Sequence, residues 1–86
     1  MPTRQNRPST TDDSLLARIK RLVDEEQHLY QQEALDDRNV VRLEALKVEL
    51  DQCWDLLRQR RALREFGKNP DAAHMRPASV VERYEQ

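Results

Sequence analysis

The sequence predicts an all-α protein built around an antiparallel two-helix hairpin. Its 86 residues include a single glycine, and they are rich in Arg, Glu, Gln, Leu and Ala, which lose little rotamer freedom in a helix. Turn dipeptides such as Asn-Gly are missing and β-branched runs are few, which argues against a sheet. Two long stretches carry apolar residues at spacings of three and four, the period of one helix face. We therefore expect a coiled-coil-like hairpin followed by short helical turns, and leave open whether it oligomerises.

The first helix is expected over about residues 13–35, after a disordered arm at 1–12 that is polar and contains two prolines. Asp12 or Asp13 is its expected N-cap, because a carboxylate there accepts backbone N–H bonds at the positive end of the helix. Glu26 interrupts the apolar stripe, either as a polar register device or where the stripe meets solvent. The stripe itself consists of Leu15, Leu16, Ile19, Leu22, Val23, Leu29 and Tyr30.

The second helix is expected over about residues 37–66, with Asp36 or Asp37 as its cap. Gly67 can adopt the left-handed backbone conformation in which helices commonly end. A connection this short makes the two helices antiparallel neighbours. Steps of three and four alternate along the second helix as in a coiled-coil seam, at Leu43, Leu46, Leu50, Cys53 and Leu57.

The remaining residues, 68–86, are expected to form a tail with short helical segments. Asn69 and Pro70 form a favourable start for a helical turn reaching about Met75, and Pro77 ends it. The stretch ASVVERY that follows can form a second short helix. That helix either docks on the hairpin or leaves the tail free, and docking would use Val80, Val81 and Tyr84.

Charge is unevenly distributed, although the net charge is only −1. Residues 24–55 contain ten acidic and three basic residues. An antiparallel pairing about residues 36–38 would gather the basic residues at the open end of the hairpin. Two explanations stay open: solvated helix faces, or assembly in which this end meets an acidic end or an acidic partner. This expected basic cluster consists of Arg18, Lys20, Arg21, Arg58, Arg60, Arg61 and Arg64.

No motif for catalysis, metal binding or cofactor binding is present. Cys53, His28 and His74 lack metal-ligand spacing, and a free cysteine within an apolar seam is expected to be a packed core residue. The carboxylate clusters at 24–26 and 36–37 lie on a slender hairpin with little concavity to raise a pKa. We therefore expect a non-enzyme with no catalytic residue, cofactor, metal or small-molecule substrate.

The cellular location is predicted from features of exported and membrane proteins that the sequence lacks. The single cysteine permits no intramolecular disulfide, and the first residues lack the apolar region of a secretory signal. No run approaches the roughly 20 apolar residues that cross a bilayer. We expect a cytoplasmic protein that does not contact membranes.

Three fragments carry a resemblance: ELDQCWDLLRQRRA at 49–62, LVDEE at 22–26 and NPDAAHMRPASVVERY at 69–84. They resemble a family of short actinobacterial helical proteins that is defined only as a domain of unknown function. The resemblance covers roughly residues 14–86 and implies a small, helical, cytoplasmic bacterial protein. It implies no activity, cofactor or site residue.

Function is therefore predicted from surfaces. Trp54 either completes the core or anchors an interface, since Trp and Arg dominate binding energy at interfaces. We expect a protein–protein interaction or self-assembly module whose partner is itself or another protein. The alternative is a small nucleic-acid- or ribosome-associated factor that uses the basic end of the hairpin through Arg58, Arg60, Arg61 and Arg64, although no recognition motif or aromatic platform accompanies these arginines. The candidate interface consists of Leu43, Leu46, Leu50, Cys53, Trp54 and Leu57.

Overall fold

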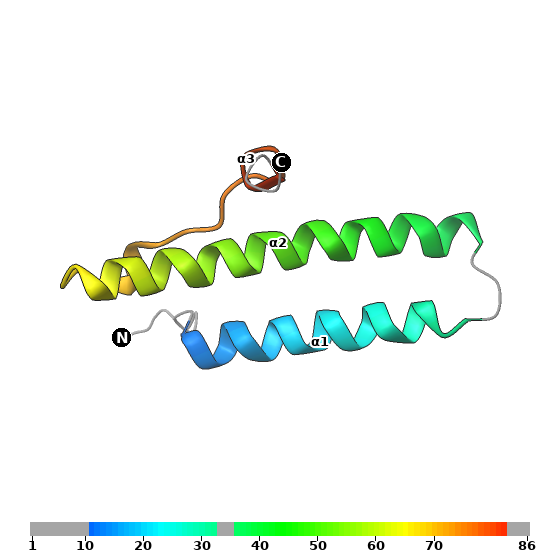
Figure 1. Ribbon diagram of the computed structural model, residues 1–86, viewed down its shortest axis with the longest axis horizontal. Coiled ribbons are helices and arrows are strands. Elements are labelled where there is room, and N and C mark those ends of the chain that lie inside the picture. The colour runs from blue at the N-terminus through cyan, green and yellow to red at the C-terminus, as the bar shows by residue number, and fades with distance from the viewer. Residues whose placement is uncertain (1–10, 33–35, 83–86) are drawn as a thin grey trace, which may run out of the picture.

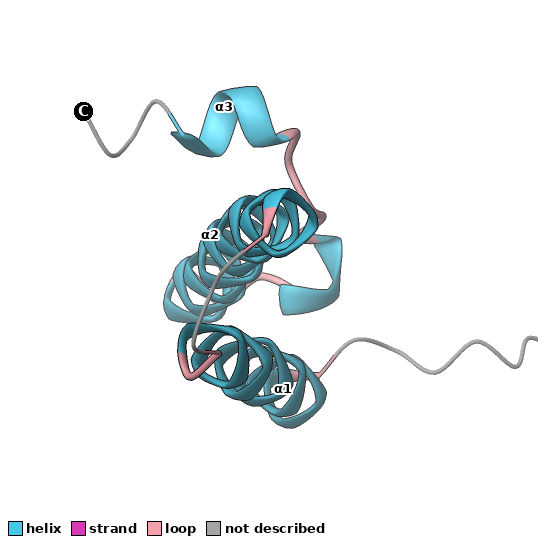
Figure 2. Cartoon of the chain, turned by 90° about the vertical axis from the view of Figure 1, so that its right-hand side faces the viewer, coloured by secondary structure: helices cyan, strands magenta, loops and turns pink. Residues whose placement is uncertain are grey.

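The computed structural model describes residues 11–32 and 36–82 and, of Val80 and Glu82, the backbone alone. It contains two long helices, α1 (Asp12–Tyr30) and α2 (Asp37–Glu65), then a 3₁₀ turn η1 (Pro70–Ala72) and a short helix α3 (Ala78–Glu82). Helices α1 and α2 lie antiparallel and side by side (Figure 1), and α2 lies between α1 and α3 (Figure 2). The predicted all-α hairpin is confirmed. Most of the expected arm and Tyr84 lie outside the described residues.

Helix α1 is capped by Thr11, so the prediction of Asp12 or Asp13 as the N-cap was wrong. The Thr11 hydroxyl accepts a hydrogen bond from the Ser14 backbone N–H at 3.0 Å, and the Ser14 hydroxyl accepts one from the Thr11 N–H at 3.0 Å. This reciprocal capping box satisfies two backbone donors that the helix itself cannot. Asp12 is left free to direct its carboxylate across the hairpin at α2.

Helix α1 ends at Tyr30, about one turn before the expected end near residue 35, while Asp36 caps α2 as predicted. The shorter α1 sets the register of the hairpin. Counting twelve residues back from Tyr30 and twelve forward from Asp37 reaches Arg18 and Glu49, whose Nη2 and Oε2 atoms are 2.6 Å apart. Counting five residues in each direction reaches a second ion pair, between Glu25 and Arg42, at 2.7 Å.

This register contradicts one prediction about the charges. Arg18, Lys20 and Arg21 were expected beside the arginines at 58–61, from a pairing centred on residues 36–38. With α1 ending at Tyr30 and α2 beginning at Asp37, the pairing of the two helices is centred three to four residues later than Tyr30, so Arg18 lies opposite Glu49, about two and a half helical turns from Arg58. The cations of α1 and those of the last turns of α2 therefore do not form one cluster.

The core lies between α1 and α2, where the predicted seam of α2 faces α1. Leu46 and Cys53 have no exposed surface, and Leu43 is also buried. Burying one leucine side chain contributes about 1.5–3 kcal/mol, so a few seam residues supply much of the stability of so small a domain. The contiguous core cluster consists of Leu15, Ile19, Leu22, Leu46, Leu50, Cys53, Leu56 and Leu57.

The end of α2 follows the prediction at Gly67, which adopts a φ of 72°. The backbone N–H of Lys68 donates to the Leu63 carbonyl at 2.7 Å, and that of Gly67 donates to the Arg64 carbonyl at 3.1 Å. These two bonds form a Schellman motif that satisfies carbonyls left over at the helix end. A residue with a Cβ would be strained at this φ, which explains the single glycine of the chain.

The tail docks on α2, as one of the two alternatives predicted. The Asn69 side chain caps η1 as expected, but the turn ends at Ala72 rather than near Met75, because Ala73 is extended with a ψ of 146°. Helix α3 forms within the expected stretch, and Val81 is buried with 2% of its surface exposed. Among residues 11–32 and 36–82, no helix combines the length and apolar character needed to cross a membrane.

Candidate functional site

The buried member of the expected basic cluster is Arg60, which joins three segments of the chain. Its Nε donates to Asp12 Oδ1 at 2.8 Å, and its Nη1 donates to Asp71 Oδ1 at 3.0 Å. Arg64 donates from Nη2 to the other Asp12 oxygen at 2.8 Å. Two of the four arginines expected to bind nucleic acid therefore bond the first turn of α1 instead, and Arg60 also bonds η1.

Asp12 makes this junction sensitive to pH. The hydrogen bond from Arg60, and to a lesser extent the contact with Arg64, lowers the pKa of the Asp12 carboxyl below its ordinary value of 3.8. A carboxyl group whose pKa is lower in the folded protein stabilises the fold in its ionised form. This contribution to the free energy of unfolding is fully present above the pKa of the group in the unfolded chain, about 3.9. That contribution is lost as the pH falls through the folded pKa.

Asp12→Asn is expected to lower the free energy of unfolding at neutral pH and to have progressively less effect in acid, as wild-type Asp12 becomes protonated. Urea denaturation followed between about pH 2 and pH 7 measures the difference. Asp13→Asn is the matched control, because Asp13 lies in the same first turn of α1 but takes no part in these contacts. An equal pH dependence for Asp12→Asn and the wild type would contradict the assignment.

The other cations divide into paired and unpaired groups. Arg18 bonds Glu49, and Lys20 lies 3.2 Å from Asp24. Both Arg18 and Glu49 are part-buried, whereas the Lys20 pair is exposed and contributes little. Within the described part of the chain, three cations of the expected cluster are exposed and have no ion pair: Arg21, Arg58 and Arg61.

Five of the six candidate interface residues lie inside the hairpin. The seam residues Leu43, Leu46, Leu50, Cys53 and Leu57 are all buried. A partner helix could reach them only if α1 separated from α2. Trp54 follows the seam residue Cys53 and so points about 100° away from it around the helix. Its side chain remains on the surface, with 44% of the residue exposed.

Cys53 occupies the position of a small core residue, as predicted. Burial raises the pKa of its thiol, opposed in part by the charge of Arg18. A buried thiol with a raised pKa is a poor nucleophile. His28 and His74 are exposed on α1 and in the tail, and no group of three metal-ligating side chains occurs in the described residues.

One side of the hairpin is closed by ion pairs, and the other carries exposed apolar and basic side chains. The Arg18–Glu49 and Glu25–Arg42 pairs close the first side. On the second side the nearby Tyr30 hydroxyl raises the pKa of the Lys47 ammonium group. We call this second side the exposed flank; by helical phase it comprises Leu16, Val23 and Tyr30 of α1 and Trp54, Arg58 and Arg61 of α2.

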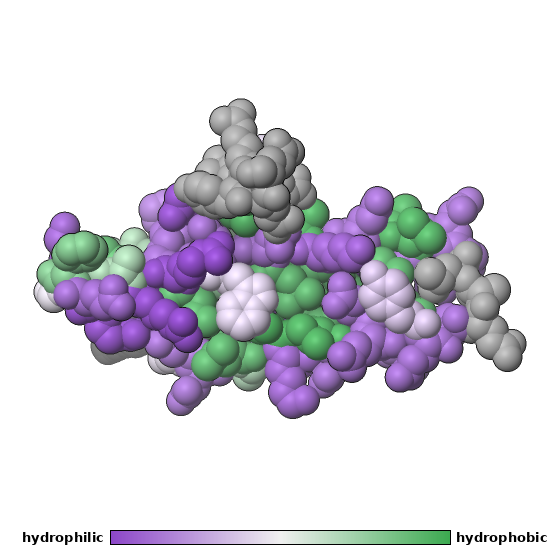
Figure 3. Space-filling model, viewed as in Figure 1, coloured by the Kyte–Doolittle hydropathy of each residue, from purple (hydrophilic) through white to green (hydrophobic). Residues whose placement is uncertain are grey.

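The exposed flank is visible as a band of apolar surface between α1 and α2, bordered by polar side chains (Figure 3). Its α1 members recur every seven residues, and its α2 members are separated by four and three. Both spacings keep side chains on one side of a helix. Leu16 has 42% of its surface exposed, close to the value for Trp54. The flank therefore presents an indole and a leucine to solvent on two rigid helices, with two arginines beyond the indole.

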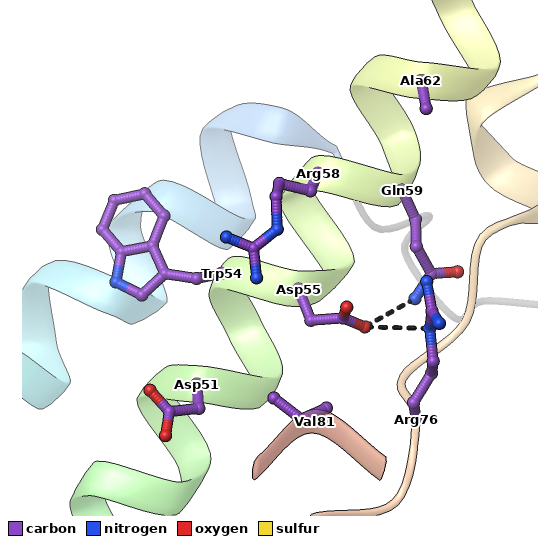
Figure 4. A pocket seen from close by; sticks show the side chains of 8 residues that line it. All are labelled: Asp51, Trp54, Asp55, Arg58, Gln59, Ala62, Arg76 and Val81. Atoms are coloured by element: carbon purple, nitrogen blue, oxygen red, sulfur yellow. Dashed lines mark hydrogen bonds and ion pairs between the residues drawn. The ribbon is translucent and has the colours of Figure 1, made fainter. Parts of the chain in front are cut away.

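An open pocket of about 640 Å³ lies beside the exposed flank, between α2 and the tail. Trp54 and Arg58 lie on its side toward the flank, whereas Gln59 and Arg76 lie toward the tail (Figure 4). The lining residues are Asp51, Trp54, Asp55, Arg58, Gln59, Ala62, Arg76 and Val81.

The far wall of the pocket is a polar clamp that fastens the tail to α2. The side-chain amide of Gln52 donates to the Arg76 carbonyl at 3.2 Å, and that of Gln59 donates to the His74 carbonyl at 2.9 Å. Between them, Asp55 accepts from Gln59 at 2.9 Å and pairs with Arg76 Nε at 3.1 Å, with 3% of its side chain exposed. The clamp explains why polar residues lie beneath the tail.

Sequence analysis did not identify this clamp, although a signal was present. Gln52, Asp55 and Gln59 are spaced by three and four, on the side of α2 away from the leucine seam. Leu56 lies among them and is buried. A second stripe with helical spacing, mixing polar groups with a leucine, indicates a helix that packs on two sides.

Comparison with known proteins adds a family but no activity. The family described as "Protein of unknown function (DUF2630)" matches residues 11–86. Uncharacterised proteins of Mycobacterium tuberculosis and Mycobacterium bovis are each 47% identical over 78 residues, covering 86% of this chain and 90% of theirs. No solved structure is significantly similar to the chain. The resemblance to an actinobacterial family of unknown function is confirmed, and the chain belongs to the DUF2630 family.

Proposed function

We propose that this chain is a non-enzymatic, cytoplasmic protein–protein interaction module that binds its partner through the exposed flank. The observation that carries the proposal is the position of Trp54, the only tryptophan, which is 44% exposed in the middle of a long helix. Trp and Arg are the residues that most often dominate binding energy when an interface forms. Arg58 and Arg61 follow Trp54 on the same side of α2.

The rest of the hairpin supports this assignment by contrast. The leucine seam is closed by α1, one side is bridged by two ion pairs, and the face beneath the tail is covered by the clamp. Among the surfaces formed by residues 11–32 and 36–82, the exposed flank is the one that combines apolar side chains from both long helices with cations that have no ion pair there. Of the other exposed apolar residues, Val41 and Phe66 lie elsewhere on α2, whereas Val40 precedes Trp54 by two heptads and continues the flank toward the start of the helix.

The nucleic-acid alternative draws less support from the arrangement. Arg60 and Arg64, two of its four proposed phosphate contacts, are already bound to Asp12. Arg58 and Arg61 remain, and two phosphate contacts provide only weak, strongly salt-dependent binding.

Site-specific photo-crosslinking tests the proposal. A benzophenone amino acid is placed at position 54 or 16, or at position 41 as the control, and the full chain is expressed in mycobacterial cells. We expect discrete protein adducts from positions 54 and 16 and none from position 41, because Val41 points away from the flank. Adducts from position 41 alone, none from any position, or adducts with RNA from position 54 would each overturn the proposal.

A further inference from the structure

We infer that the partner of the exposed flank is a second copy of this chain, bound in a symmetric antiparallel dimer whose two-fold axis passes beside Trp54. This inference rests on the proposed function and names the partner. In a two-fold symmetric interface both subunits use the same surface. If one residue of the first copy contacts another residue of the second copy, the reverse contact between the same two positions is also made. The surface must therefore be complementary to itself.

The charges around Trp54 satisfy that requirement. Asp51 lies three residues before Trp54 and Arg58 four residues after it, and both line the same pocket. In Figure 4, Asp51 and Arg58 are attached to α2 on opposite sides of Trp54 along the helix, and the indole extends away from both side chains. When two α2 helices cross antiparallel at Trp54, Arg58 of each copy faces the partner's Asp51. The dimer thus gains two equivalent ion pairs beside a central aromatic contact.

Within one chain these two charges cannot satisfy each other. They are seven residues apart, which separates them by about 10 Å along the helix. Neither forms an ion pair among the described residues. Opposite charges placed almost equally on both sides of an exposed indole are therefore available to a second copy.

The apolar part of the flank fits the same contact. Two indole rings meeting at the axis can stack or pack edge to face, and each would also cover the exposed Leu16 beside it. Leu16 brings α1 into the interface, so the dimer is a four-helix assembly. Helix α3 lies on the side of α2 away from α1 and leaves the band between them uncovered (Figures 2 and 3).

Sedimentation equilibrium of the full chain, with charge-swapped variants, tests this geometry. The wild type is expected to dimerise, and Trp54→Ala is expected to abolish the dimer. Asp51→Arg and Arg58→Asp each place like charges together twice in the dimer, so each should raise the dissociation constant about tenfold or more. The double variant Asp51→Arg/Arg58→Asp restores both pairs and should return within a few-fold of wild type. Val41→Ala is the control, and circular dichroism verifies that each variant keeps its helices.

The outcomes separate this inference from the proposed function. A monomeric chain that still crosslinks to a different protein from position 54 overturns the dimer and leaves the interaction module standing. A dimer that survives Trp54→Ala uses another surface and overturns the inference. Single variants that dissociate without rescue in the double variant also overturn the two-fold contact. A monomer that forms no adduct from position 54 overturns both.

Discussion

Leu46→Ala is expected to lower the free energy of unfolding by about 3–5 kcal/mol, the largest effect of any single truncation in this chain. Leu46 has no exposed surface and lies in the middle of the seam between α1 and α2. Alanine there removes buried apolar atoms and leaves a cavity that two straight helices cannot easily close. A chain of 86 residues has a total stability of roughly 4–13 kcal/mol, so this loss is a large fraction of the total.

Urea denaturation followed by circular dichroism at 222 nm measures this change. Val41→Ala is the matched control, because Val41 is 65% exposed on the same helix and should change stability by about 0.5 kcal/mol or less. Similar losses for the two variants would show that Leu46 does not occupy the core position described here.

Arg76→Ala is expected to cost about 3 kcal/mol, because it leaves the Asp55 carboxylate buried with Gln59 as its one remaining donor among the described residues. The chain can relieve this cost by releasing the tail, which rehydrates Asp55 but exposes Val81 and Leu56. The expected result is therefore a lower free energy of unfolding together with faster proteolysis and amide exchange over residues 73–82. Both readouts are measurable on the full chain.

Two further variants distinguish this mechanism from a general loss of charge. Arg21→Ala removes an exposed guanidinium that pairs with no described residue and lies outside the exposed flank, and should be nearly neutral in stability. Asp55→Ala/Arg76→Ala removes the buried charge as well and should be more stable than Arg76→Ala alone. If the double variant were the less stable of the two, the buried carboxylate would not be the source of the cost.

The parts of the fold that could be predicted from sequence are those set by neighbours along the chain. Asp36 at the start of α2, Gly67 at its end and Asn69 before η1 all take their predicted roles, because each acts within a few residues of itself. The wrong cap prediction for α1 shows the limit of this rule. Thr11, Asp12 and Asp13 are all suitable capping residues by type, and Thr11 takes the position. The Asp12 carboxylate instead bonds Arg60, which is distant in sequence.

The candidate site could be predicted only in part. Trp54 was identified as an interface candidate and lies exposed, yet its five companions in that set are buried in the seam. The residues of the expected basic cluster do not lie together in the structure. Because α1 ends at Tyr30, the pairing register differs from the predicted one and Arg18 lies opposite Glu49. An error of about one turn in one helix end changes the partner of every residue on that helix.

The sequence by itself determined the all-α class, the two amphipathic helices and the seam that joins them, because periodicity is a local property of the chain. Only the tertiary structure decided which cations are neutralised, how the tail is clamped and which apolar face is left open. Those outcomes depend on the register between segments distant in sequence. Arg60 bonds Asp12 across the hairpin and Asp71 beyond Gly67, and neither partner follows from the residues adjacent to Arg60.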